Sequence, residues 1–576
     1  MPMNGSANQR QGIYLLALTS TSKRTFLCML KNKHQGITRV PRKPVVLVSG
    51  NTEVSITLLV AFLVRKRMCP PVDQALKKNG QELRREDFPH DFLFGSATSA
   101  YQIEGASREG SKGISIWDSF AGTPGKIEDG SSGDVACDHY NLYKEDVNLM
   151  SSLGFTAYRF SISWARIFPD GFGNVVSQEG IQFYNNLIDS LIEKGIKPFV
   201  TLYHWDLPQP LEDKLGGWLS PEIPKYFVAY AEACFKAFGD RVKHWITLNE
   251  PARFAILGHC LGIHAPGRSS NRSRSLYGDS SVEPYVVGHH ALLAHAAAVK
   301  VYREKYKEKQ GGLIGLAVDS EWPEPLTSSL EDRQASQRHL EFMLGWFLDP
   351  IYFGKYPTSM SESLGERLPR FTAEQMAFIH GSVDFIGINH YFSAYVTTRH
   401  AVKKNSPWSA GWYEDVNTFL QFERNGEPIG EKGASFWMYN VPWGFGKLLK
   451  WLTDRYNRPV MFITENGTDE ENDPSKSLTE SLHDTRRVRI LQEFLFFVSQ
   501  AIRAGADIRG YFVWSLLDNF EWSVGYTKRF GIVFVDYNDN TKRYPKDSAL
   551  WFKKFLASPP LIKLQTNPLL LQSLSP

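Results

Sequence analysis

The chain of 576 residues contains few cysteines and no motif built from them. Its five cysteines are scattered, and no two of them form a Cys-x-x-Cys pair. The sequence therefore indicates neither a zinc ribbon nor a dithiol redox site, and we predict no metal and no cofactor. This cysteine usage also does not require an oxidising compartment.

Long apolar runs are missing as well. Residues 54–64 form an apolar run of eleven residues, which three basic residues follow at 65–67. The run is too short to span a bilayer. It also lies too deep in the chain, with its charges on the wrong side, for a secretory signal peptide. We therefore predict no membrane partner.

Acidic residues are nearly absent from the beginning of the chain. Residues 1–67 contain eleven Lys or Arg and one acidic residue, a balance of +10, which leaves −6 for the remainder of a chain whose net charge is +4. The mildly acidic remainder has no footprint for nucleic acid, so we predict no such partner. We assign residues 1–86 to a basic extension that is disordered or a presequence. A transit-like presequence and a translation start at Met68 both stay open.

From residue 89 onward, eight short β-rich runs alternate with longer segments of helical periodicity. Most of the runs are continuous stretches of β-branched and aromatic residues, as expected for parallel strands that are buried on both faces. They cover residues 92–98, 155–161, 196–203, 243–248, 313–319, 383–389, 459–464 and 509–515. Helical periodicity is clearest at residues 181–194, 221–238 and 289–305.

This alternation predicts an α/β fold, a (β/α)8 TIM barrel with long βα loops over residues 87–556. A doubly wound open sheet is the alternative, but it requires a Gly-rich fingerprint after its first strand, and this sequence has none there. Residues 557–576 are rich in Pro and Leu without periodicity, and we assign them to a disordered tail.

Polar and aromatic side chains lie in or directly after the C-terminal parts of the predicted strands, where barrel enzymes hold their active sites. They are Gln102, Arg159, His204, Asn249, Glu250, Tyr391, Glu465 and Trp514. Glu250 and Glu465 each follow an apolar strand directly, so both should project into the barrel mouth. A single Glu at a strand end is usually an ordinary polar residue. Two carboxylates that face one cleft suit glycoside cleavage, in which one protonates the departing oxygen and the other attacks or activates water.

Several separate motifs surround these residues in chain order. They are Gln102-Ile103-Glu104-Gly105, Tyr158-Arg159-Phe160-Ser161, Tyr203-His204-Trp205-Asp206, Thr247-Leu248-Asn249-Glu250-Pro251, Ile463-Thr464-Glu465-Asn466-Gly467 and Asn519-Phe520-Glu521-Trp522. With them the chain resembles family 1 glycoside hydrolases, the β-glucosidase family, and particularly its plant-type members, over residues 87–555. The resemblance implies a barrel fold and a retaining mechanism without metal or cofactor.

The resemblance also implies roles for individual residues. Glu250 matches the general acid that later acts as the general base, and Glu465 matches the nucleophile. Arg159 and Tyr391 match residues that orient the nucleophile, and Asn249 matches the residue that binds the sugar 2-hydroxyl. The implied substrate-binding residues are Gln102, His204, Asn249, Tyr391, Trp437, Trp514, Glu521, Trp522 and Phe530. For Trp437 and Phe530, ordinary packing stays open as the alternative.

The implied activity is hydrolysis of terminal β-D-glucosyl residues from O-glucosides with small or phenolic aglycones, or from oligosaccharides. Glu250 stands where thioglucosidases of the family carry Gln, so an O-glycosidase is expected. Galactosides and fucosides are further candidate substrates. A transglucosidase on the same scaffold and a non-catalytic sugar-binding relative are the alternatives. Ser269 stands where secreted plant relatives carry a disulfide cysteine, which favours the cytoplasm, with a plastid as the alternative. The sequence does not predict an oligomeric state.

Overall fold

The fold was analysed in a computed structural model that describes residues 83–399 and 411–557. The predicted extension over residues 1–86 lies outside the described residues up to residue 82, and the predicted tail lies outside them from residue 558. Both assignments therefore stay predictions.

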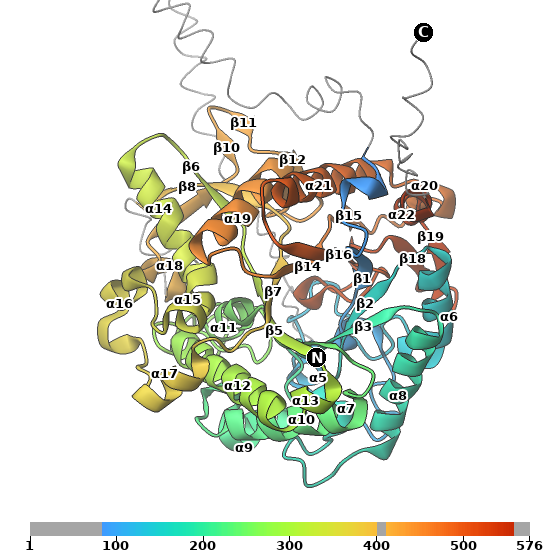
Figure 1. The fold of residues 1–576 in the computed structure, drawn as a ribbon, viewed down its shortest axis with the longest axis horizontal. Helices are drawn as coiled ribbons and strands as arrows, with labels where there is room; N and C mark the ends of the chain where they lie inside the picture. The colour runs from blue at the N-terminus through green and yellow to red at the C-terminus, as the bar shows by residue number, and fades with distance from the viewer. Residues whose placement is uncertain (1–82, 400–410, 558–576) are drawn as a thin grey trace, which may run out of the picture. The chain divides into compact units, whose positions relative to one another are not determined.

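Eight parallel strands close into a barrel in the order β1-β16-β14-β7-β5-β4-β3-β2. The strands are β1 (Leu93–Ala97), β2 (Ala157–Ser161), β3 (Lys197–Tyr203), β4 (His244–Asn249), β5 (Leu313–Asp319), β7 (Phe385–Asn389), β14 (Met461–Asn466) and β16 (Ile508–Trp514). Each corresponds to one of the eight predicted β-rich runs. Figure 1 shows them gathered at the centre, with the longer helices around them. The predicted (β/α)8 barrel is confirmed.

Side chains fill the interior of the barrel, so it is a packed core and not a pore. Every strand contributes at least one residue to this packing, and small and large residues both take part. The buried interior residues are Ala97, Ala157, Phe199, Ile246, Ala317, Phe385, Phe462, Phe512 and Trp514. Because this layer is closed, polar groups near the strand ends can gather only above it, in the barrel mouth.

The predicted helices lie on the outside of the barrel. They are α8 (Gln178–Glu193), α10 (Ile223–Phe238) and α12 (Glu283–Lys305). The Ser177 hydroxyl caps α8 by accepting a hydrogen bond from the Gly180 N–H, and this helix buries Phe183, Leu187 and Leu191, which are spaced by four residues. Further helices of the ring are α6 (His139–Ser152), α15 (Trp346–Phe353), α19 (Pro442–Arg455), α21 (Thr485–Arg503) and α22 (Asp547–Ala557).

The βα loops carry additional structure. A three-stranded sheet is formed by β6 (Trp322–Pro325), β8 (Ser393–Thr398) and β9 (Thr418–Gln421), which lie after β5 and β7 in the chain. The short helix α11 (Pro251–His259) begins directly after Glu250. These insertions add a small sheet and a short helix after the ends of β4, β5 and β7.

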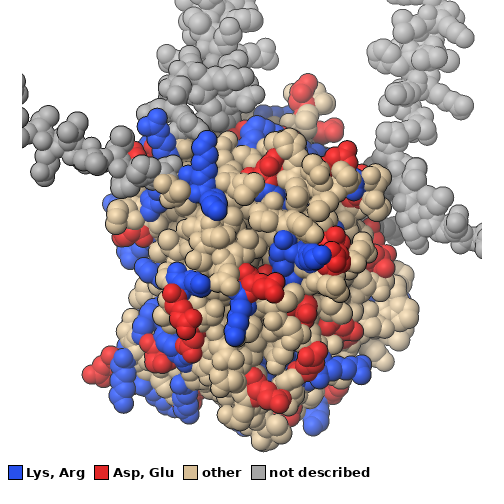
Figure 2. Space-filling model, turned by 90° about the vertical axis from the view of Figure 1, so that its right-hand side faces the viewer, with Lys and Arg blue, Asp and Glu red and all other residues tan. Residues whose placement is uncertain are grey.

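The described residues contain no helix that is long and apolar enough to cross a membrane. Within the same ranges, no three His, Cys, Asp or Glu side chains are grouped to hold a metal ion. Figure 2 shows one face of the molecule, on which basic and acidic side chains are interspersed.

The loop that lacks the expected disulfide cysteines is held by hydrogen bonds. The buried hydroxyls of Ser269 and Ser280 both donate to the carbonyl oxygen of Cys260, at 2.8 and 2.7 Å. The Ser269 N–H also donates to the carbonyl oxygen of Tyr277, at 2.9 Å. Cys260 is the residue that caps the C-terminal end of α11. Two serines thus tie the loop to the helix that begins after Glu250.

This arrangement predicts non-additive losses of stability for Ser269→Ala and Ser280→Ala. Each single substitution leaves the Cys260 carbonyl with one donor, so each should lower the free energy of unfolding by about 1 kcal/mol. The double variant leaves that buried carbonyl with neither donor and should lose more than the sum of the two. Denaturant unfolding of the four proteins of this cycle measures the difference, and strictly additive losses would contradict the shared-carbonyl arrangement.

Candidate active site

The two predicted carboxylates lie in the mouth of the barrel. Glu465 is part of β14, and Glu250 joins β4 to α11; their exposed fractions are 3% and 7%. Glu250 has a left-handed backbone conformation with φ of 46°, which costs about 1–2 kcal/mol for a residue other than glycine. Its N–H donates to the carbonyl oxygen of Ala317 on β5, at 2.9 Å. The sharp turn that begins α11 thus stays hydrogen-bonded to the neighbouring strand.

Both oxygens of Glu465 accept hydrogen bonds from donors outside β14. A guanidinium N–H of Arg159, on β2, donates to Oε1 in a buried ion pair. The Tyr391 hydroxyl donates to Oε2 at 2.6 Å. Burial, followed by the charge of Glu465, raises the pKa of Tyr391 well above its ordinary value, so this hydroxyl keeps its proton. The guanidinium compensates the charge of Glu465, and the two donors together fix its orientation.

Within residues 83–399 and 411–557, no cation forms an ion pair with Glu250. Its Oε1 accepts a hydrogen bond from Asn389 Nδ2 at 2.6 Å, and the Thr464 hydroxyl holds the Asn389 amide in place at 2.6 Å. Burial raises the pKa of Glu250 well above its ordinary value, and the charges of Asp319 and Glu465 raise it further. The two carboxyl groups therefore differ in their surroundings, because one is paired with a buried cation and the other is kept in its neutral form.

Asn249 links the two carboxyl groups to His204. Its Oδ1 accepts hydrogen bonds from Arg159 at 2.6 Å and from Asn389 at 3.0 Å. Its Nδ2 lies 3.1 Å from Nε2 of His204. Burial and the nearby Arg159 lower the pKa of His204 well below its ordinary value, so the ring is neutral and Nε2 accepts. The proton then sits on Nδ1, which has no hydrogen-bond partner among the described residues and can donate to a ligand.

An aromatic wall stands next to His204. Its ring stacks with those of Trp514 and Trp522, at centroid distances of 5.7 and 6.0 Å. Glu521 is buried beside Trp522 in the chain, and its Oε1 has no hydrogen-bond partner within the described part of the chain. Burial, followed by the charges of Asp469 and Asp518, raises the pKa of Glu521 well above its ordinary value. A buried oxygen without a partner in this position is available to a polar ligand.

The remaining predicted residues differ in their hydrogen-bond partners and in their exposure. The Gln102 amide already bonds Asn519 Oδ1 and the Phe520 carbonyl oxygen, both at 2.8 Å. Trp437 and Phe530 both contact Tyr391, with ring centroids 6.4 and 6.0 Å apart. Phe530 is buried, whereas Trp437 stays partly exposed. Of Gln102, Trp437 and Phe530, Trp437 is the residue with a partly exposed side chain.

The sequence prediction assigned no role to three residues at this site, although Asn389 was among the polar residues at the strand ends. Asn389 binds Glu250, and Asp319 at the end of β5 forms an ion pair with Arg253 of α11. The signal for Asp319 was its place as the last residue of a predicted strand, the position that identified the other site residues. Asn389 likewise ends its strand. Arg253 lies one helical turn after Glu250, and nothing in the sequence pairs it with β5.

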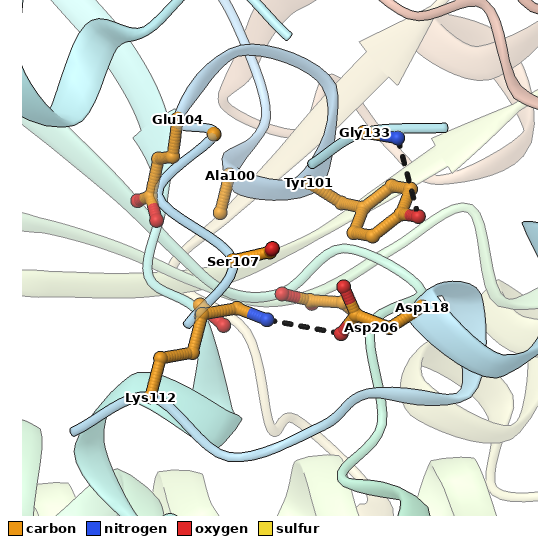
Figure 3. Close-up of a pocket in the computed structure, with 10 residues that line it drawn as sticks. Ala100, Tyr101, Glu104, Ser107, Lys112, Asp118, Gly133 and Asp206 are labelled. Carbon is orange, nitrogen blue, oxygen red and sulfur yellow. Dashed lines mark hydrogen bonds and ion pairs between the residues drawn. The ribbon is translucent and has the colours of Figure 1, made fainter. Parts of the chain in front are cut away.

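A small cavity is lined by residues from the segments that follow β1, β2 and β3, among them Glu104, Lys112, Asp118 and Asp206 (Figure 3). The Lys112 ammonium forms an ion pair with the Asp118 carboxylate at 2.9 Å, so its ion-pair partner in this cavity is Asp118 and not Asp206. Burial, together with the Glu104 carboxylate, raises the pKa of Asp206 to about 7. Asp206 is thus a buried carboxyl group that titrates near neutral pH, two residues after His204.

Titration of Asp206 should make the protein less stable as the pH rises. A folded-state pKa near 7 exceeds the unfolded value, so the contribution of this group is full below about pH 4 and is lost as the pH rises through 7. Asp206→Asn cannot ionise, so its melting temperature should fall less than that of the parent between pH 5 and pH 8. Thermal unfolding of both proteins across that interval measures the effect. Parallel curves would show that Asp206 does not titrate there.

A closed (β/α)8 barrel that carries one cation-paired carboxylate and one neutral carboxyl group at its mouth has the arrangement of a glycoside hydrolase. Comparison with known proteins agrees with this class. Residues 84–559 match the model of the family described as glycosyl hydrolase family 1. The chain belongs to glycosyl hydrolase family 1.

Plant proteins are among its similar relatives. The chain is 56% identical over 473 residues to beta-glucosidase 42 of Arabidopsis thaliana, with 82% of this chain and 94% of the relative covered. It is 54% identical over 477 residues to beta-glucosidase 4 of Oryza sativa subsp. japonica, with 82% and 96% covered. A solved structure of a mutant rice beta-glucosidase, in a covalent complex with Glc, superposes with a TM-score of 0.81 at 50% identity. That comparison covers 83% of this chain and 100% of the rice chain.

Proposed function

We propose that the protein is a retaining β-glucosidase that releases terminal β-D-glucosyl residues from O-glucosides with small or phenolic aglycones. The observation that carries the proposal is the pair Glu250 and Glu465, which share one buried mouth in unlike surroundings. The names of the plant relatives support glucosidase activity. The covalent complex with Glc of the rice relative supports a glycosyl-enzyme intermediate.

In the proposed mechanism, Glu465 attacks the anomeric carbon while Glu250 gives its proton to the glycosidic oxygen. The bond between that carbon and oxygen breaks, the alcohol leaves, and the sugar stays bonded to Glu465. Glu250, now a carboxylate, then takes a proton from water. The oxygen of that water attacks the anomeric carbon and releases Glu465 as a carboxylate. Two displacements leave the configuration of the sugar unchanged.

The groups around the two carboxyls assist these steps. Arg159 and Tyr391 orient Glu465 for attack, since each donates to one of its oxygens. Asn249 is held by Arg159 and His204, which supports its role on the sugar 2-hydroxyl. We assign the glycone site to the residues that surround it: Gln102, His204, Asn249, Tyr391, Trp514, Glu521, Trp522 and Phe530. Trp437, which is partly exposed beside Tyr391, is assigned to the aglycone.

Two further assignments follow. A phosphorylated glycone is disfavoured, because Glu521 would place an acidic group near the phosphate. We place the catalytic domain at residues 87–556.

Two alternative functions are disfavoured. The presence of both Glu250 and Glu465 argues against a non-catalytic sugar-binding protein. The names of the relatives favour hydrolysis over transglucosylation.

If sodium azide is added to the assay, alanine variants of the two carboxyl groups should form glucosyl azides of opposite anomeric configuration. Glu465→Ala should reduce p-nitrophenol release from p-nitrophenyl β-D-glucoside by about ten-thousandfold or more, because no glycosyl-enzyme forms. Azide can enter the space of the missing carboxylate and attack from that side, so the product should be α-glucosyl azide. In Glu250→Ala, azide replaces water in the second displacement, so the product should be β-glucosyl azide.

Proton NMR of the products distinguishes the two configurations. Glu193→Ala, on the exposed end of α8, is a matched control that should keep the parental rate. If both alanine variants gave the same anomer, or if Glu465→Ala kept its activity, the assignment of roles would be wrong. Parallel assays with β-galactoside and β-fucoside measure the choice of glycone.

A further inference from the structure

Asp319 is an acidic residue in the barrel mouth that the proposed mechanism does not use. It ends β5, two residues after Ala317, which points into the barrel interior. Since side chains on one face of a strand recur every two residues, Asp319 points to the same side, above the packed layer. In the strand register it lies opposite Asn389 of β7, whose amide donates to Glu250.

Arg253 holds Asp319 in place. Its Nε donates to Asp319 Oδ2 in an ion pair, and its Nη2 donates to Glu321 Oε2 at 2.7 Å. Glu321 is held in turn by His339, at 2.7 Å. Asp319 is 6% exposed, and its Oδ1 has no hydrogen-bond partner among the described residues. A negative charge is therefore fixed close to Glu250 in surroundings of low polarity, where charges interact strongly.

The charged and titratable groups that face Glu250 come from β5, β14, α11 and the segment after β7. Asp319 on β5 and Glu465 on β14 are anions, Arg253 on α11 is a cation, and Tyr391 follows β7 as a neutral hydroxyl. After burial, Asp319 has the largest effect in raising the pKa of Glu250, ahead of Glu465. Burial raises the pKa of Asp319 itself to about 6 against the opposing effect of Arg253, so Asp319 is charged at neutral pH.

The two anions differ in what happens to them during the reaction. Glu465 loses its charge when it bonds to the sugar, and its effect on Glu250 ends at that point. Asp319 takes no part in bond formation, so its charge remains in the glycosyl-enzyme. In that state Glu250 must accept a proton from water, and a carboxylate with a nearby anion is a stronger base.

We propose that Asp319 is a positioning residue that acts through Glu250: its charge holds the proton on Glu250 in the free enzyme and strengthens Glu250 as a base in the glycosyl-enzyme. The inference rests on the proposed function, since it takes Glu250 as the acid and base. Arg253 serves it by keeping Asp319 charged and aimed into the mouth.

The test is the pH dependence of kcat/KM and of kcat for the Asp319→Asn variant. Removing the anion makes loss of the Glu250 proton easier, so the basic limb of kcat/KM should move down by about one pH unit. With 2,4-dinitrophenyl β-D-glucoside, a burst of dinitrophenolate identifies deglycosylation as the slow step. The acidic limb of kcat then reports Glu250 as a base, and it should move down by a similar amount. Asp319→Glu keeps the charge and should return both limbs toward the parental values.

The controls separate this inference from the proposed function and from damage to the fold. Asp349→Asn breaks a comparably buried Asp–Arg pair, between Asp349 of α15 and Arg455 of α19 at 2.6 Å, and should leave both limbs unchanged. Asp319→Ser, a second neutral variant, should shift the limbs as Asp319→Asn does. Melting temperatures identify any variant that fails to fold.

The dinitrophenolate leaves without a proton, so Glu250→Gln can still react with this substrate. Its kcat/KM should lack the basic limb, because the variant has no carboxyl group at position 250 to ionise. If that limb persisted unchanged, the role of Glu250 and with it the proposed function would fail. If Glu250→Gln abolished the limb but both neutral variants at position 319 kept the parental limbs, Asp319 would have no effect on Glu250. The inference would then be overturned while the proposed function stood.

Discussion

The buried guanidinium of Arg159 is the interaction on which the site depends. It donates to Glu465, Asn249 and Thr201, so it joins side chains from β14, β4 and β3 to its own strand, β2. A buried cation is costly unless an anion and acceptors surround it, and here the anion is Glu465 of the barrel mouth. The ion pair gives one of two neighbouring carboxyl groups a counterion and leaves the other without one. The proposed division of roles between nucleophile and acid rests on that asymmetry.

Closure of the barrel makes this meeting of distant residues unavoidable. Arg159 and Glu465 are 306 positions apart in the chain, yet parallel strands in one closed sheet end at the same rim. The packed layer of Phe199, Phe462 and Phe512 below them leaves the polar groups no other direction. The left-handed turn at Glu250 then places the second carboxyl at the same rim, because α11 starts there and not further along the chain.

This geometry explains which parts of the protein were predictable from the sequence. The eight strands are continuous apolar runs, and the rule that chemistry lies at strand ends needs only their order, so Glu250 and Glu465 could be placed in one mouth. The pairing of Arg253 with Asp319 depends on how the first turn of α11 sits against β5, which no local pattern encodes. The same holds for the serines at positions 269 and 280, whose shared acceptor is a carbonyl contributed by the end of a helix.

Buried acidic groups in this protein behave differently according to their partners and not their depth. Asp518 is even more buried than Asp319, and burial raises its pKa. Lys546 and Arg529 contact its two oxygens, however, and bring the pKa below its ordinary value. Asp319 has one cation that it shares with Glu321, and its pKa stays raised. A doubly paired carboxylate strengthens the fold near neutral pH, whereas a singly paired one keeps a charge that can act on a neighbour. The second kind lies beside Glu250, where the proposed reaction requires control of a proton.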